Sequence, residues 1–192
     1  MIDPFNITNF NRTNAELEEL LLFCICAANK PAVQIATKVD WFLRQQHCEK
    51  RRGTPFKKLR MLIRAGLLEK QLKWARLSPY TKNRVACYNL SELPWYVSDI
   101  TLDQLTQIHG VGEKTARMFM LYSRPAQNFA ILDTHVLRWM KNRGHEVPKW
   151  HPTGNVYRKL EISFLNECTA AGKTPWEMDR EIWQANAIGR PQ

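Results

Sequence analysis

The stretch TLDQLTQIHGVGEKTARMFMLY, residues 101–122, decides the fold that we predict for this chain of 192 residues. Thr101, followed three positions later by Gln104, is typical of a capping box that opens a short helix. Gly110 and Gly112 then allow a tight turn, and a second apolar helical pattern begins directly after them. The stretch therefore predicts a helix-hairpin-helix, in which two helices are joined by a glycine turn.

The turn of this hairpin is a candidate site for phosphate groups. Its backbone amides lie at the N-terminus of a helix, where an anionic group is favoured, and the glycines permit a close approach. A glycine pair between two helices can also be a plain turn, so the turn alone does not decide the function. The candidate phosphate contacts are Gly110, Val111, Gly112 and Glu113.

Helical patterns also predominate in the rest of the chain. Apolar residues recur at helical spacing in 14–28 and 31–46, with Asn14 as the expected N-cap of the first helix. Residues 77–94 are rich in Pro, Ser, Asn and Thr, which predicts irregular chain around a short element at 84–88. The C-terminal third predicts short helices separated by glycine and proline. No run alternates apolar and polar residues with a period of two over a convincing length, so we expect an all-α fold.

The chain is strongly basic. It has 28 Lys and Arg residues against 18 Asp and Glu, a formal net charge of +10 and a pI of about 9.6. Much of this charge lies in residues 50–73, whose spacing predicts an amphipathic helix that ends near Gly66. The cationic face of this helix either contacts the phosphates of a nucleic acid or is simply solvated. Its candidate phosphate contacts are Lys57, Lys58 and Arg60.

The composition excludes several classes of protein. Apolar residues make up 44% of the chain, which excludes an intrinsically disordered protein. The longest apolar stretch, residues 20–28, is too short to span a membrane, and the acidic residues before it do not fit a signal peptide. The five cysteines are scattered without a C-x2-C pair, which argues against a zinc site or a disulfide framework. We therefore expect a soluble, intracellular protein without a bound metal.

Two motifs carry a resemblance to a known family. The first is IHGVGEKTA, residues 108–116, and the second is ILDTH, residues 131–135. Together they resemble the helix-hairpin-helix DNA glycosylase superfamily, the endonuclease III and 8-oxoguanine glycosylase group, whose members share L-P-G-V-G-x-K-T-A and V-D-T-H. His109 stands where the family usually has proline. Cys168 is the only cysteine after Cys87, so the iron–sulfur motif of the endonuclease III branch is missing and no such cluster is expected.

The resemblance implies an all-α fold of two helical lobes with a DNA-binding cleft between them. Residues 29–127 form a central helical barrel lobe, which contains the helix-hairpin-helix at 101–124. Residues 1–28 and 128–192 form the second lobe, which carries the catalytic aspartate. The implied partner is double-stranded DNA that contains a modified base or an abasic site, bound by a monomer away from any membrane.

The resemblance assigns the chemistry to Lys114 and Asp133. A lysine amine in this position attacks C1′ of the deoxyribose, expels the base and forms a Schiff base that permits strand cleavage by β-elimination. Asp133 also precedes an amphipathic helix that ends near Gly144, so it is an expected N-cap. Its negative charge can take up the lysine proton and stabilise the cationic sugar. A phosphate-binding lysine and a purely structural cap are the simpler alternatives.

The resemblance also suggests how the base is extruded and held. Asn29, in the turn after the first long helix, is the candidate wedge that fills the gap in the base stack, although it can equally cap that helix. The candidates for the base pocket are Trp183, Asp179, Phe119 and Cys26, and an aromatic residue at helical spacing is often a core residue instead. The tail that contains Asp179 and Trp183 resembles the C-terminal helix of archaeal-type 8-oxoguanine glycosylases, which favours 8-oxoguanine as the target base.

The sequence thus predicts a base-excision repair DNA glycosylase with AP lyase activity. Two alternatives stay open at this point. One is a monofunctional glycosylase in which Asp133 activates water, and the other is a non-catalytic helix-hairpin-helix DNA-binding protein. No cofactor is expected, and a monovalent cation on the carbonyls of the hairpin is compatible with the prediction.

Overall fold

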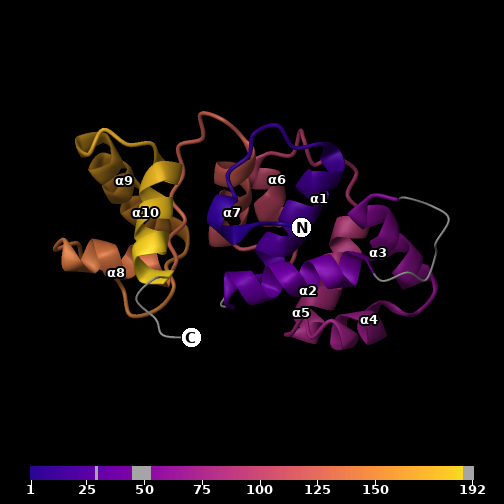
Figure 1. Cartoon of the computed structure of the whole chain (residues 1–192). Coiled ribbons are helices and arrows are strands. Elements are labelled where there is room, and N and C mark those ends of the chain that lie inside the picture. The colour runs from indigo at the N-terminus through magenta and orange to yellow at the C-terminus, as the bar shows by residue number, and fades with distance from the viewer. Residues whose placement is uncertain (29, 45–52, 188–192) are drawn as a thin grey trace.

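A computed structural model describes residues 1–28, 30–44 and 53–187 of the chain. Within these ranges the chain forms helices and connecting segments without a β-strand, which confirms the predicted all-α fold (Figure 1). The elements are η1 (Pro4–Asn6), a short 3-10 helix, and α1 (Asn14–Cys26), α2 (Ala32–Arg44), α3 (Pro55–Arg64), α4 (Leu68–Trp74), α5 (Tyr80–Ser91), α6 (Leu102–Gln107), α7 (Glu113–Ser123), α8 (Thr134–Asn142), α9 (Gly154–Ala170) and α10 (Pro175–Ala187). None of the described helices is long and apolar enough to cross a membrane.

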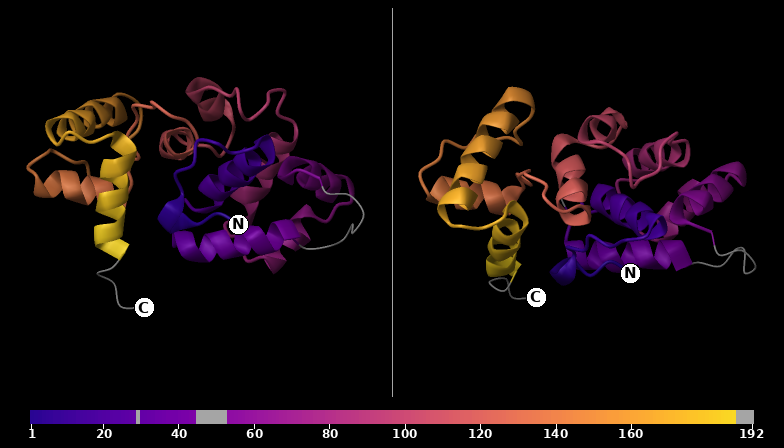
Figure 2. Two further views of the ribbon diagram at one scale, coloured as in Figure 1. Left: turned by 45° about the horizontal axis from the view of Figure 1, so that its top comes forward. Right: turned by 90° about the horizontal axis from the view of Figure 1, so that it is seen from above.

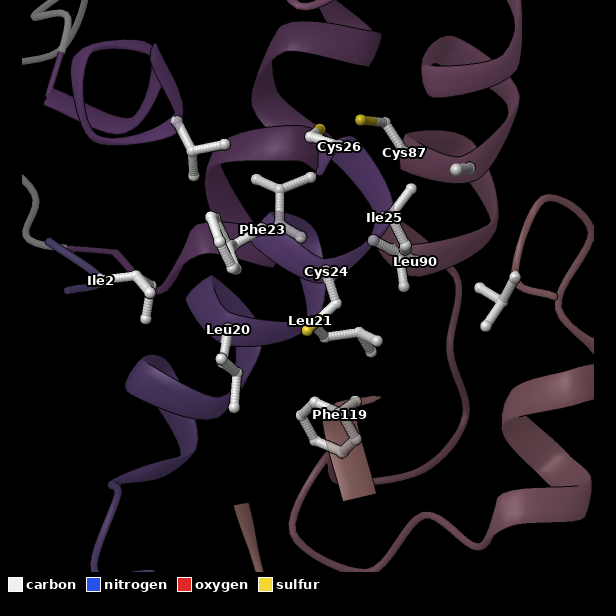
Figure 3. Packing of buried hydrophobic residues seen from close by; sticks show 14 of the residues in the cluster. Ile2, Leu20, Leu21, Phe23, Cys24, Ile25, Cys26, Cys87, Leu90 and Phe119 are labelled. Atoms are coloured by element: carbon white, nitrogen blue, oxygen red, sulfur yellow. The ribbon is translucent and has the colours of Figure 1, made fainter. Parts of the chain in front are cut away.

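Helices α1 to α7 form one lobe around α1 (Figures 1 and 2). Helix α1 is apolar on every side along residues 20–26, whose side chains are at most 2% exposed. A helix without a polar face must be buried all round, and α1 accordingly packs against α2, α3, α5 and α7. Figure 3 shows the side chains of α1 among Cys87 and Leu90 of α5 and Phe119 of α7.

Helices α8, α9 and α10 form a second lobe at the other side of the molecule (Figures 1 and 2). This lobe has its own core, which includes Val136 of α8, Phe164 of α9 and Ile182 of α10. The segment that connects α7 to α8 takes part in both cores, because Ile131 packs in the first and Leu132 in the second. Neighbouring residues of this segment therefore anchor it to both lobes.

The N-terminal helix lies in the first lobe, which corrects the prediction that residues 1–28 join the second. A helix that is apolar on every side is stable only where other apolar residues surround it. The larger hydrophobic core, in the first lobe, provides this position. The segment before α1 does approach the second lobe. The ring of Phe5 lies edge-on to Trp183 at 5.2 Å, and that of Phe10 lies edge-on to Trp176 at 6.3 Å. The N-terminal segment therefore bridges the two lobes at α10.

Three local predictions differ from the structure. The N-cap of α1 is Thr13 rather than Asn14, because Thr13 donates its amide to Glu16 at 2.8 Å in a capping box. Residues 80–91, for which the sequence predicts mostly irregular chain, form α5, because their apolar face is buried against α3 and α4. The C-terminal third contains the 17-residue helix α9 in place of short helices only. In the last two cases tertiary packing overrides the local preference of the sequence.

Candidate active site and nucleic-acid interface

The predicted helix-hairpin-helix is present, with α6 and α7 joined by the turn at residues 108–112. Thr101 caps α6 as predicted, because its hydroxyl accepts from the amide of Gln104 at 3.2 Å. Gly110 has a φ of +94°, and a Cβ there would lie 3.4 Å from the Cβ of Ala86 in α5. The turn therefore requires glycine at this position.

Gly112 has a different environment. Its φ of −85° is open to any residue, and a Cβ there would meet no described atom within 4 Å. The chain is therefore open on the side of Gly112 where a side chain would lie, which leaves room for a ligand to approach the turn. The amide of Val111, however, donates to the carbonyl of Ile108 at 2.9 Å within the turn. This corrects the prediction for Val111 and leaves the amides of Gly112 and Glu113 as the candidate donors.

The two predicted catalytic residues each lie at the N-terminal end of a helix. Lys114 is half-buried in the first turn of α7. Asp133 is the N-cap of α8, as predicted, and its Oδ1 accepts from the amides of His135 and Val136 at 2.8 and 2.9 Å. Both hydrogen bonds use the same oxygen, so Oδ2 is left for a further partner. The cap thus fixes the carboxylate in place and still presents one of its oxygens.

Two other titratable groups, Asp179 and His151, are influenced by the charges of both Lys114 and Asp133. The carboxyl of Asp179 in α10 is buried, and its pKa is raised to about 8, first by burial and then by the charge of Asp133. A hydrogen bond from Tyr122 and the charge of Lys114 act in the opposite direction on this pKa. The pKa of His151 is lowered by burial and by Lys114, against the effect of Asp133. Both charges therefore act on both groups, although Lys114 belongs to the first lobe and Asp133 to the second.

The four predicted base-pocket residues do not lie together on an open surface. Phe119 and Cys26 are 0% and 2% exposed and belong to the core around α1 (Figure 3). The structure uses these two residues to pack the first lobe, in contrast to the prediction that they contact a base. Asp179 ties α10 to α7 through its hydrogen bond, and Trp183 is half-buried beside the N-terminal segment. The predicted wedge, Asn29, lies outside the described residues.

The basic face of α3 is only partly available to a ligand. Lys57 is exposed, but Lys58 donates to a carbonyl in the last turn of α2 at 2.6 Å. Arg60 likewise donates to the last carbonyl of α5 at 3.0 Å. The C-terminal end of a helix favours cations, which explains both contacts. Two of the three predicted phosphate contacts therefore hold α3 against its neighbours, and the basic residues 50–52 lie outside the described chain.

A second cationic surface lies on the second lobe, and the sequence prediction missed Lys149 and Trp150 as parts of it. A groove of about 400 Å³ lies between α8 and the segment that follows it. Its lining carries Arg138, Lys141 and Lys149 without an acidic side chain, and Trp150 beside them is 72% exposed. Basic residues interleaved with an aromatic ring are typical of a surface for nucleic acid, and the run KWH at 149–151 is the signal that could have revealed it. We name this surface, defined by these four residues, the Trp150 groove.

The Trp150 groove adjoins the candidate active site. Its wall includes Thr134, the residue directly after Asp133, and also His151. His151 is one of the two groups on which the charges of Lys114 and Asp133 both act. A DNA strand bound in the groove would therefore pass close to Lys114 and Asp133.

The described cysteines do not offer a competing centre. Cys24, Cys26, Cys87 and Cys168 are buried thiols without a disulfide, and burial raises the pKa of Cys24 and Cys26 to about 12. Such thiols are poor nucleophiles. Within the ranges that the structure describes, no group of three or more His, Cys, Asp or Glu side chains is placed to hold a metal ion.

The chain shares its all-helical fold with solved 8-oxoguanine DNA glycosylases. It is similar to the Methanocaldococcus jannaschii 8-oxoguanine glycosylase/lyase, solved in complex with DNA that contains 8-oxoguanine. The TM-score is 0.71 and the identity 22%, over 95% of this chain and 86% of that one. The 8-oxoguanine DNA glycosylase of Thermotoga maritima is similar with a TM-score of 0.67 and 21% identity, over 93% and 83% of the two chains. No family model matches the sequence.

Proposed function

We propose that the protein is a DNA glycosylase that excises a damaged base and then cleaves the resulting abasic site. The observation that carries this proposal is that one segment adjoins both residues: Gly154 donates to Glu113, beside Lys114, at 2.8 Å, and His151 lines a groove together with Thr134, beside Asp133. A lysine in the first turn of the hairpin helix and a carboxylate fixed as an N-cap provide a nucleophile and a countercharge. The likeness in fold to 8-oxoguanine DNA glycosylases supports the proposal.

In the proposed reaction, Nζ of Lys114 attacks C1′ of the extruded nucleotide. The bond between C1′ and the base breaks, and the base leaves with the bonding electron pair and takes up a proton. Asp133 accepts a proton from the attacking amine, and its charge stabilises the cationic character of the sugar. Opening of the sugar ring gives a Schiff base. Removal of a C2′ proton then expels the 3′ phosphate by β-elimination, and water releases the lysine.

The target base that we propose is 8-oxoguanine. The M. jannaschii protein of similar fold was solved with DNA that contains this base. In the present chain, α10 carries the half-buried ring of Trp183 one turn after the buried carboxyl of Asp179. An aromatic ring for stacking and a buried polar group are what a pocket for an extruded base needs.

The DNA backbone has two proposed contact surfaces, one on each lobe. The amides of Gly112 and Glu113 at the start of α7 form the first, and the Trp150 groove forms the second. Each surface adjoins one of the proposed catalytic residues, since Lys114 follows Glu113 and the groove begins beside Asp133. We propose that the chain acts on double-stranded DNA as a monomer, with a contact from each lobe on either side of the extruded nucleotide.

Borohydride trapping on duplexes with single lesions tests this function. We expect a covalent adduct on duplexes that contain 8-oxoguanine or an abasic site, and none on an undamaged duplex of the same sequence. Release of the base without an adduct would indicate a monofunctional glycosylase in which Asp133 activates water. Binding without release of any base from a panel of lesions would refute the proposal and leave a DNA-binding module.

A further inference from the structure

A buried ion pair connects the hairpin helix α7 with α9 of the second lobe. Arg117, three residues after Lys114, donates from Nε and Nη2 to the two carboxylate oxygens of Glu161 at 2.8 and 3.0 Å. The side chains of both residues are buried, with Arg117 5% and Glu161 8% exposed. Burial of two charges is costly, and this two-point contact has a fixed geometry. The pair therefore sets the position of α7 relative to α9.

The same carboxylate also holds the chain that leads to Asp133. Oε1 of Glu161 accepts from the amide of Ala130 at 2.8 Å. The hydroxyl of Tyr157 donates to the carbonyl of Ala130 at 2.7 Å and accepts from the amide of Leu132 at 3.2 Å. This segment has no regular secondary structure, so its buried backbone groups depend on these side chains for their hydrogen bonds. Two residues of α9 thus fix the backbone directly before the proposed countercharge.

Further contacts complete the connection. The guanidinium of Arg117 lies over the ring of Tyr157, 4.4 Å from its centroid. Glu113, the residue before Lys114, accepts at Oε2 from the amide of Gly154 at 2.8 Å. The first turn of α7 is therefore held at both Glu113 and Arg117, on either side of Lys114. The three side chains Arg117, Tyr157 and Glu161 form what we call the Glu161 network.

We propose that the Glu161 network consists of positioning residues that set the place of Asp133 relative to Lys114 for the reaction. The network reaches Lys114 through Arg117 on the same helix and reaches Asp133 through the backbone of residues 130–132. A displacement of about 1 Å between reacting groups costs on the order of 10²-fold in rate. A small shift of α7 or of residues 130–132 would therefore slow the reaction measurably. The proposal rests on the proposed function of Lys114 and Asp133.

Tyr157→Phe and Glu161→Gln test the network, with Glu167→Gln as the matched control. Tyr157→Phe removes both hydrogen bonds to residues 130–132 and keeps the ring, whereas Glu161→Gln removes the charge. Glu167 lies on the same helix and pairs with Arg143 at 2.9 Å and with His145 at 3.0 Å in a more exposed position, but it does not contact the segment before Asp133. We expect single-turnover excision of 8-oxoguanine to slow by between about 10-fold and 10²-fold in the two network variants, with Kd for the duplex unchanged. The control should excise at the wild-type rate.

The Asp133→Asn background separates positioning from general destabilisation. If the network acts through the charge of Asp133, adding Tyr157→Phe to Asp133→Asn should change the excision rate by less than about twofold, while the losses in thermal stability add. Wild-type rates in both network variants, or rate losses that multiply in the double variant, would overturn the proposal. Should Tyr157→Phe fail to fold, Glu161→Gln carries the same comparison.

A failure of the proposed function would give a different result from a failure of the network. A wild-type protein that releases no base from any duplex would refute the function by itself. Amide hydrogen exchange at Ala130 and Leu132 tests the geometry of the network without any activity. We expect exchange at the Leu132 amide, which donates to the Tyr157 hydroxyl, to be faster in Tyr157→Phe than in the wild type, and exchange at the Ala130 amide, which donates to Glu161, to be faster in Glu161→Gln. Both should be unchanged in Glu167→Gln. Unchanged exchange in Tyr157→Phe would overturn the network itself.

Discussion

Neutralisation of the Trp150 groove tests where the protein holds the DNA backbone. In the variant Arg138→Gln, Lys141→Gln, Lys149→Gln, three cations of one groove are lost, and the structure places no acidic side chain in its lining. Each phosphate contact contributes about 0.9 to the slope of log affinity against log salt concentration on duplex DNA. Loss of Lys141 and Lys149 should make the slope shallower by up to about 1.8. The change should reach about 2.7 if Arg138, whose guanidinium donates to Asn186, also contacts a phosphate.

The basic face of α3 provides the matched control, with Lys57, Lys58 and Arg60 changed to Gln together. Lys58 and Arg60 already donate to carbonyls at the ends of α2 and α5, so only Lys57 is expected to contact DNA. The slope should then change by no more than about 0.9. The same variant should lose stability, by about 1 kcal/mol for each of the two hydrogen bonds removed, which thermal denaturation would detect.

Fluorescence anisotropy of a labelled duplex, titrated at several salt concentrations, measures both slopes. The two variants carry the same change in net charge, so a nonspecific effect of charge would shift both slopes equally. An unchanged slope in the groove variant would refute the assignment of the groove to the DNA backbone. A larger change in the α3 variant than in the groove variant would show that the contacts of Lys58 and Arg60 open when DNA binds.

Three further predictions concern the site itself. Lys114→Ala should abolish borohydride trapping and leave the affinity for DNA within a few-fold, because one charge is a small part of the footprint; trapping by this variant would remove Lys114 as the nucleophile. Asp133→Asn should keep a melting temperature close to that of the wild type, since Asn caps a helix nearly as well as Asp, but should slow excision by a factor on the order of 10². For Asp179, the pKa is raised to about 8 in the folded protein from an ordinary value near 3.8. Between these two pH values the folded protein keeps the proton on Asp179 and the unfolded chain releases it. Its contribution to stability is therefore present at low pH and lost as the pH rises toward 8, so Asp179→Asn should gain in melting temperature relative to the wild type across that range. A constant difference between the two melting temperatures would contradict the buried, protonated carboxyl.

The parts of the site that the sequence predicts well are local. The capping box of Thr101, the glycine turn and the cap formed by Asp133 each depend on residues within a few positions of one another. Their geometry follows from backbone hydrogen bonding and from the steric limits on φ, which a short stretch of sequence contains in full. The prediction for Val111 was wrong because the turn uses that amide internally, and this depends on the turn type rather than on composition.

The parts that the sequence could not predict depend on distant partners. Phe119 and Cys26 have the residue types of a pocket, and only the position of α1 at the centre of the lobe shows that they are core. Lys58 and Arg60 have the spacing of an exposed cationic face, and the ends of α2 and α5 that occupy them lie 15 and 31 residues away. Helical periodicity defines which face of a helix is apolar, but it does not show what lies opposite the polar face.

The candidate site is divided between two cores, and α7 carries both Lys114 and several of the polar contacts that hold the two lobes together. Lys114 belongs to the first core through α7, whereas Asp133 belongs to the second core through α8. Arg180 of α10 donates to the carbonyl of Phe5 at 3.1 Å. Three further polar contacts between the lobes start on α7, where Glu113, Arg117 and Tyr122 reach the beginning of α9, the middle of α9 and α10. An apolar interface alone would let the lobes slide, while hydrogen bonds have a preferred length and direction and select one arrangement. Because α7 starts at the hairpin that we propose to bind phosphate, a shift of α7 on DNA binding would move Lys114 and pull on its three contacts together.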